Sequence, residues 1–306
     1  MLESARLPAM HTFNKKALLP YLVLGFGILC LSFSALFVKW ADAPGVVTGF
    51  YRLGLATLIL LPFFTRQTRA QPLSLRWGIL IFPLLGGIFT ALDHAVWNTS
   101  LQYTSAANAT LLGNTASLWV ALAAWLIFHE KLARLFWLGL AFALGGAAIV
   151  LGSDFLQQPS LGLGDLLALT AGFFYAGYFF ATQFGRQYLH TLPYLWIVSL
   201  TAALVLLGIS LLLRQPLTGY SPQTYLAFLG AALVSQVGGY FSVGYALGHL
   251  PATVIAPTMI LQPVLTALLA IPLLGEQLHP AQWLGGCAVL VGIYLVHHSR
   301  LAGRER

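Results

Sequence analysis

Charged residues are scarce in this chain. Asp, Glu, Lys and Arg make up 8% of its 306 residues, whereas soluble domains carry about 25%. Hydrophobic residues make up 58%, and the mean hydropathy is +0.82. A soluble protein of this length could not bury so much apolar surface, so lipid must be its solvent. Long apolar runs without alternation favour helices over a β-barrel.

Cysteines are few, and motifs for nucleotides or metals are missing. Cys30 and Cys287 both lie in apolar runs, which suggests neither a disulfide framework nor a metal site. No G-x-x-x-x-G-K-[ST] phosphate loop occurs in the chain, so any transport must run on a gradient. We expect no cofactor. The net charge of +7 comes from basic residues scattered among short loops and the two ends, so we expect no nucleic-acid partner.

Long apolar segments are what the chain has in abundance. Ten of them are each near the ~20 residues needed to cross ~30 Å of hydrocarbon. Proline and polar residues separate them, as expected of connecting turns. The sequence therefore predicts an all-α polytopic membrane protein with ten transmembrane helices. The predicted helices are 18–38, 44–64, 77–97, 102–127, 133–152, 163–187, 191–213, 223–247, 251–274 and 280–298.

The chain also repeats itself. Residues 100–151 resemble residues 246–297 at a constant shift of 146 residues, which places Glu130 on Glu276. Each half holds five predicted spans, and an odd number of spans inverts the second half relative to the first. Inverted repeats build secondary transporters with a binding site between the halves. The predicted organisation is an N-terminal segment, a five-helix repeat, a linker, a second five-helix repeat and a C-terminal tail, at 1–17, 18–152, 153–162, 163–298 and 299–306.

Basic residues gather on one side of the predicted membrane. With the N-terminus inside, twelve lie on the cytoplasmic side and two on the other, and Arg52 lies within the membrane. The positive-inside rule then places both termini in the cytoplasm. We expect a multi-pass protein of the inner cell membrane. The twelve are Arg6, Lys15, Lys16, Arg66, Arg69, Arg76, Lys131, Arg134, Arg186, Arg300, Arg304 and Arg306, and the two are Lys39 and Arg214.

Several short motifs are typical of one family of membrane proteins. They are Phe50–Leu53, Trp97–Asn98, Tyr103–Ala109, and the acids Glu130 and Glu276. On these residues the chain resembles the drug/metabolite transporter superfamily, of the EamA-like type with two five-helix repeats, over about 18–298. The resemblance implies a permease for small molecules. It also implies that helices 1, 3, 4, 6, 8 and 9 surround a central cavity, with helices 5 and 10 at the periphery.

Two charged residues stand inside the predicted spans. Arg52 lies about eight residues into 44–64, and Asp93 lies about five residues, or ~7 Å, from the outer end of 77–97. A central Arg costs about 2.5–3.5 kcal/mol to insert, so it should face a partner or water. The two could form a cavity pair that binds a zwitterionic or anionic substrate. They could also form a fixed structural ion pair, or Arg52 could snorkel independently of Asp93.

A polar face on the third predicted helix points to the same region. Thr90, Asp93, His94 and Trp97 recur at helical spacing. Such a stripe should line protein or water rather than lipid. Asp93 and His94 could carry a coupled proton, because both can titrate near neutrality in a low-dielectric site. The alternative is a set of hydrogen bonds between packed helices.

Further amides and aromatic rings complete the candidate cavity. They are Asn108, Asn114, Gln236 and Gln262, with Tyr175, Tyr178 and Tyr240. Each amide could contact substrate or bond across helices. The tyrosines could form a wall that stacks flat or cationic substrates, or they could pack in the core.

The two repeats differ in their proline content at one pair of equivalent helices. Pro257, Pro263 and Pro272 interrupt the predicted helix 251–274, whereas its repeat partner 102–127 contains none. We therefore expect a kink in the second-half helix, acting as a gate hinge or as a static bend.

Three acids stand beside predicted helix starts. Glu130 and Glu276 follow repeat-related helices, where a carboxylate would cap amide donors and suit the helix dipole; ion coupling is the alternative. Asp165 ends a Gly-Leu-Gly-Asp string that also occurs in intramembrane proteases. Because no second aspartate in a Tyr-Asp pair accompanies it, we expect it to cap a helix.

These observations favour secondary export of small metabolites, amino-acid-like or other, or of drugs, by alternating access. Metabolite uptake is the alternative within transport, and a non-transporting regulatory membrane protein or an intramembrane enzyme are alternatives outside it. An enzyme is not expected, because Asp-rich prenyl-diphosphate motifs and a metal-spaced His cluster are missing. The expected partners are a small-molecule substrate and the lipid bilayer, with a coupled proton as a further candidate.

The predicted topology has a direct test. A cysteine placed at Gln157 should react with an impermeant thiol reagent from outside, because the linker between the repeats lies there. A cysteine at Thr68 should react only after permeabilisation. Opposite accessibility at the two positions would overturn both the topology and the inverted repeat.

Overall fold

The computed structural model is helical throughout the part of the chain that it describes. That part comprises residues 15–72, 76–104, 106–151, 162–274 and 280–302, and no strand occurs in it. Nine helical segments there are long and apolar enough to cross a membrane, and Arg134–Val150 is apolar but shorter. The protein is therefore an all-α polytopic membrane protein, as its composition predicts.

Several spans consist of more than one helical segment. The first half contains α1 (Lys15–Ser32), α2 (Ser34–Trp40), α3 (Gly45–Ala70), α4 (Trp77–Ser100), α5 (Ala106–Gly113), α6 (Ala116–Leu126) and α7 (Arg134–Leu151). The second half contains α9 (Leu163–Gly185), α10 (Thr191–Leu212), α11 (Pro222–Gly230), the π-helix η1 (Ala231–Tyr240), α12 (Phe241–Leu247), α13 (Ala252–Thr258), α14 (Leu261–Leu274) and α15 (Pro280–Ala302).

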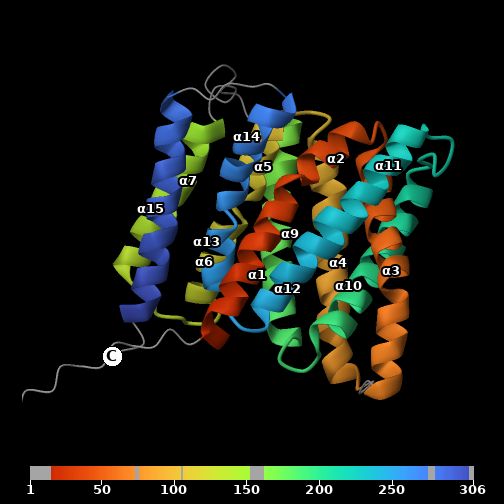
Figure 1. Ribbon diagram of the computed structural model, residues 1–306, viewed down its shortest axis with the longest axis horizontal. Helices are drawn as coiled ribbons and strands as arrows, with labels where there is room; N and C mark the ends of the chain where they lie inside the picture. The colour runs from red at the N-terminus through yellow and green to blue at the C-terminus, as the bar shows by residue number, and fades with distance from the viewer. Residues whose placement is uncertain (1–14, 73–75, 105, 152–161, 275–279, 303–306) are drawn as a thin grey trace, which may run out of the picture.

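The two halves run in opposite directions. Figure 1 shows α1 beginning and α15 ending at the lower edge of the molecule, whereas α9 begins at the upper edge. The start of α9 is tied to the turn after α4, because Thr104 Oγ1 donates to Asp165 Oδ1 at 2.7 Å. Asp165 also accepts from Gly162 N at 3.1 Å, which is the capping role expected for it.

The crossing of α7 with α15 displays the relation between the repeats. A Cβ added to Gly146 would lie 2.6 Å from the Gly285 carbonyl oxygen, and one added to Gly139 would lie 2.7 Å from that of Gly292. The shift of 146 residues places Gly139 on Gly285 and Gly146 on Gly292. Each contact is therefore the counterpart of the other, as in a two-fold isologous interface. Glycine is required here because the helix backbones touch.

The fourth span is broken, which the sequence does not predict. We expected 102–127 to be continuous because it lacks proline, but α5 ends at Gly113 and α6 begins at Ala116. Around the break, Asn114 Nδ2 donates to Thr110 O at 2.8 Å, and Ser117 Oγ donates to Asn114 O at 2.9 Å. Side-chain bonds to the backbone compete with helical amides and bend helices. Polar side chains thus accompany the break in the fourth span, which contains no proline.

The ninth span is broken at the matching place. Here α13 ends at Thr258, one residue after Pro257, and α14 begins at Leu261. The shift of 146 residues brings this break within one residue of the break in the fourth span. The interruption is therefore a property of both repeats, and proline reinforces it in only one.

Two further irregularities occur in spans that face each other. Phe33 forms a turn between α1 and α2, and the eighth span contains the ten-residue π-helix η1. The two spans pack closely, since a Cβ added to Gly27 would lie 3.0 Å from Gly239 O. The hydropathy of the sequence predicts neither the turn at Phe33 nor the π-helix. Both carry polar side chains that reappear in the candidate site.

The α7–α15 contact yields a stability prediction with a control one residue away. Gly146→Ala should lower the thermal stability of the purified protein, because the added methyl meets the α15 backbone and overpacking costs about 1–3 kcal/mol. Gly145→Ala should be neutral or slightly stabilising, because nothing lies within 4 Å of its Cβ and alanine favours helix. Thermal unfolding in detergent measures both. Equal stability of the two variants would contradict this packing.

Candidate functional site

A central cavity lies between the two repeats. Its volume is about 50 Å³. Sites for drug-sized ligands have volumes of about 300–1,000 Å³. In this conformation the cavity therefore admits water or a small group. Its lining residues are Leu31, Ser34, Arg52, Asp93, His94, Trp97, Thr110, Gly113, Asn114, Tyr175, Tyr240 and Gln262.

Most of the predicted cavity residues meet here. Eight of them line the cavity: Arg52, Asp93, His94, Trp97, Asn114, Tyr175, Tyr240 and Gln262. Gln236 and Tyr178 contact lining residues without lining it themselves, and the side chain of Asn108 falls outside the described residues. Their part in substrate binding stays a prediction. The lining also includes the second span through Arg52, which the family resemblance alone did not imply.

Arg52 holds its guanidinium deep in the protein, with 2% of the residue exposed. Its Nη1 donates to Ser34 Oγ at 2.7 Å, and its Nε donates to Gln236 Oε1 at 3.1 Å. Its Cζ lies 5.2 Å from the centre of the Tyr240 ring, a cation–π distance. Nη2 is buried and has no hydrogen-bond partner. The guanidinium is thus oriented by neutral groups and keeps a donor free.

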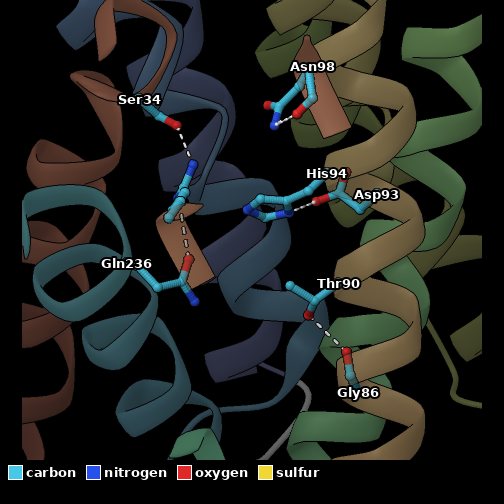
Figure 2. A network of polar contacts seen from close by, with 9 residues as sticks. Ser34, Gly86, Thr90, Asp93, His94, Asn98 and Gln236 are labelled. Carbon is cyan, nitrogen blue, oxygen red and sulfur yellow. Dashed lines mark hydrogen bonds and ion pairs between the residues drawn. The ribbon is translucent and has the colours of Figure 1, made fainter. Parts of the chain in front are cut away.

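Asp93 and His94 lie across the cavity from these partners. Figure 2 shows Ser34 and Gln236 on the left and Asp93 with His94 on the right, with the imidazole ring pointing leftward. His94 Nδ1 lies 3.3 Å from Asp93 Oδ2, although the contact lacks hydrogen-bond geometry. Exposed side-chain area is 3% for His94 and 11% for Asp93. The carboxylate is therefore the more accessible of the two groups.

Arg52 and Asp93 do not form the structural ion pair that was one alternative. Asp93 makes its acid–base contact within ~4 Å with His94 rather than with Arg52. Arg52 does not snorkel either, because it is almost fully buried. Two opposite charges thus share one cavity without touching. A buried, unpaired charge is costly unless water or a ligand satisfies it.

Aromatic rings form the apolar part of the site. The ring centres of Tyr175 and Tyr178 lie 5.9 Å apart in a stacked pair, and Tyr240 lies 5.9 and 5.5 Å from them. Tyr178 is 1% exposed, so it packs behind the lining as the packing alternative predicts. Trp97 is fixed from α5, because its Nε1 donates to Ala109 O at 3.2 Å.

Two of the predicted amides, Gln262 and Gln236, bond across helices. Gln262 Nε2 donates to Leu31 O at 3.0 Å, and Gln236 accepts from Arg52. Both observations fit the cross-helix alternative. Gln262 still lines the cavity, so the contact with Leu31 does not remove it from the site.

A second pocket lies at the upper end of the bundle. It is lined by Val38, Lys39, Asp42, Ala43, Asn98, Leu101 and Gln102. Asn98 follows Trp97 on α4, so neighbouring residues of one helix line the two spaces. Asn98 Nδ2 donates to Gly45 O at 2.9 Å, which fixes α4 to the start of α3.

The site is asymmetric although the scaffold repeats. α3 and α10 begin at Gly45 and Thr191, which the shift of 146 residues also relates. The same shift places Tyr240 on His94, and these two rings lie 5.6 Å apart. It places Val198 on Arg52 and Gly239 on Asp93. The first half thus supplies both charges of the cavity.

Some site residues escaped prediction, and some predicted acids lie elsewhere. Ser34, Thr110 and Gly113 line the cavity, but small residues in an apolar run carry no signal in a single sequence. Glu130 lies in the turn before α7, which begins at Arg134, so its capping role stays a prediction. Glu276 falls outside the described residues.

An inverted pair of helical repeats around a buried polar cavity is the architecture of a membrane transporter. Two stretches, 18–152 and 162–297, match the model of the EamA-like transporter family. The chain therefore belongs to the EamA-like transporter family and, with it, to the drug/metabolite transporter superfamily.

Relatives that are named as transporters agree with this assignment. An uncharacterized transporter of Archaeoglobus fulgidus is 29% identical over 294 residues, which cover 90% of this chain and 96% of that protein. A probable amino-acid metabolite efflux pump of Salmonella typhimurium is 29% identical over 181 residues, which cover 55% of this chain and 60% of that protein.

A solved crystal structure shares the fold. It superposes with a TM-score of 0.75 at 17% identity and covers 94% of this chain and 98% of the solved chain. At this level of identity the likeness concerns architecture alone.

The hydrogen bond from Arg52 to Ser34 can be tested by comparing substitutions of Ser34 and of nearby Ser32. Ser34→Ala should lower the free energy of unfolding by about 1–3 kcal/mol, because it leaves a buried charged donor without its acceptor. Ser32→Ala should cost less, because Ser32 Oγ donates to backbone carbonyls of Ile28 and Gln262. Both serines are buried, which makes the pair comparable. Thermal unfolding in detergent should rank Ser34→Ala as the less stable variant, and the reverse order would argue against this network.

Proposed function

We propose that this protein is a secondary transporter of the cell membrane that exports small metabolites by alternating access. The observation that carries the proposal is the buried polar cavity lined by residues of both repeats. Transporters with inverted repeats bind substrate at the repeat interface and rock one repeat against the other around that site. The interrupted fourth and ninth spans support this mechanism, because broken helices provide the bends on which such motion can turn.

The proposed direction of transport, from the cytoplasm outward, has its own support. One relative is named as a probable amino-acid metabolite efflux pump, and the basic residues favour a cytoplasmic location of both termini. In that orientation the end of the bundle where α2 ends and α3 begins, drawn at the top of Figure 1, faces outward. The second pocket lies at this end. Substrate would enter from the cytoplasm, bind among the cavity residues and leave past Asn98.

Asp93 and His94 are the proposed carriers of a coupled proton. They face Arg52 of α3, Tyr240 of η1 and Tyr175 of α9 within one cavity. A proton can shift the equilibrium between inward-open and outward-open states only through different affinities for the two. The partly accessible carboxylate of Asp93 supplies a proton acceptor whose surroundings change when the cavity opens on the other side.

Export predicts a phenotype and a reconstituted activity. Overexpression should allow a cell to grow in higher concentrations of some compounds in an array of toxic metabolites and dyes. Purified protein in proteoliposomes should then move the same compound down its gradient. Increased sensitivity of the cells, with transport retained, would indicate uptake. No transport of any compound that gave a phenotype would support a regulatory membrane protein instead.

Proton coupling has its own test in the same vesicles. An imposed pH gradient should accelerate wild-type transport, and Asp93→Asn should lose this acceleration because its amide cannot take up a proton. Exchange of substrate across the membrane should persist in the variant if binding survives. Undiminished acceleration in Asp93→Asn would exclude Asp93 as the proton carrier.

A further inference from the structure

We infer that Arg52 is the specificity-determining residue of the central cavity and that it binds the carboxylate group of the substrate. The inference rests on the proposed transport function and names the substrate chemistry of the same site. It starts from the free Nη2 donor, which is buried in a cavity-lining residue and has no partner. A donor of this kind is expected to be satisfied by a group that enters the cavity.

The guanidinium is presented in a geometry that suits a carboxylate. Arg has five N–H donors in a rigid fork. One bonds Ser34 through Nη1 and one bonds Gln236 through Nε. These two contacts come from opposite repeats and fix the plane of the fork. Three N–H donors remain, two on Nη2 and one on Nη1, and neighbouring donors of this kind can donate to both oxygens of a carboxylate.

The charge balance favours one negative charge on the ligand. Among the described residues that line the cavity, Arg52 is the one permanent cation, and Asp93 can add a negative charge. A doubly charged phosphate would meet one cation and an opposing acid. A carboxylate would neutralise the guanidinium, and the face of Tyr240 would remain in place behind it. The narrow space also suits a small head group better than a phosphate ester.

The carboxylate can come from two kinds of molecule. In an amino acid, the ammonium group would lie near the accessible Asp93 while the carboxylate lies on Arg52. In an amine-free organic acid, Asp93 would have to be protonated, because two anions would otherwise share the cavity. The shared chemistry is the carboxylate on Arg52, and the amino group distinguishes the sources.

The first test needs no variant. The purified full chain would be presented with a set of L-amino acids, the amides of the same amino acids, and the corresponding carboxylic acids without the amino group. Binding is measured as the shift in thermal unfolding, and transport as counterflow in proteoliposomes. Removing the carboxylate should weaken binding at least ~10-fold, since charge-assisted hydrogen bonds are lost. Equal binding of acids and amides, or no binding of any carboxylate, would overturn the assignment.

The second test uses Gln236, which touches the guanidinium. Gln236→Glu places an internal carboxylate on Arg52, so it should fold but bind the preferred carboxylate at least ~10-fold more weakly. Gln236→Leu is the matched control: it removes the contact without supplying a charge and should weaken binding less. Arg52→Gln should abolish the discrimination between acid and amide. Unchanged carboxylate binding in Gln236→Glu, or unchanged discrimination in a folded Arg52→Gln, would contradict the carboxylate contact.

A variant of Asp93 distinguishes the two kinds of substrate, amino acids and amine-free organic acids. Loss of the preference for amino acids over amine-free acids in Asp93→Asn, with Arg52-dependent binding retained, identifies a zwitterionic substrate. Equal binding of both kinds by the wild type identifies a simple carboxylate, and either result supports the role of Arg52. Transport of a compound without any carboxylate preference would leave the transporter proposal standing and remove this one. Carboxylate binding without counterflow would support the role of Arg52 and argue against the transporter proposal.

Discussion

A positive charge held inside a membrane protein organises the centre of this structure. Arg52 cannot lose its charge and cannot reach water at the surface, so the surrounding helices must satisfy it. They do so with features that regular helices do not offer. The turn at Phe33 precedes Ser34, and the π-helix η1 carries Gln236 and Tyr240. π-helical segments are often found at functional sites, and here one serves to bring an acceptor and an aromatic face to the same guanidinium.

The fold could be predicted because lipid imposes simple rules on sequence. A span must be long, apolar and helical, and a repeated pattern of five spans must invert. A break inside a span was predictable only where proline accompanies it, as at Pro257. The matching break at Asn114 was not, since its polar side chains could equally have bonded across helices. Hydropathy averages over a whole span, and such local competition for backbone groups does not change the average.

The candidate site was predictable to the extent that its residues are unusual in a membrane. Arg52, Asp93 and His94 stand out in apolar surroundings, and the structure places all three on one cavity. Ser34 and Gly113 do not stand out, because small and weakly polar residues are common in packed spans. Whether Arg52 and Asp93 touch also depended on three-dimensional spacing. Their separation, rather than an ion pair, is what leaves the cavity chemically open.

The glycine contacts between α7 and α15 show that the two halves still meet as near-equivalent partners, yet their central residues have diverged. Val198 and Gly239 occupy the places that Arg52 and Asp93 hold in the first half. Two identical copies of the first half, assembled about the same axis, would carry two such guanidinium groups and two such carboxylates. Joining the halves in one chain removes that constraint, because each can mutate alone. A cavity with one cation on one wall then offers different surroundings to the two ends of its ligand, whereas a symmetric assembly of identical halves offers the same groups to both.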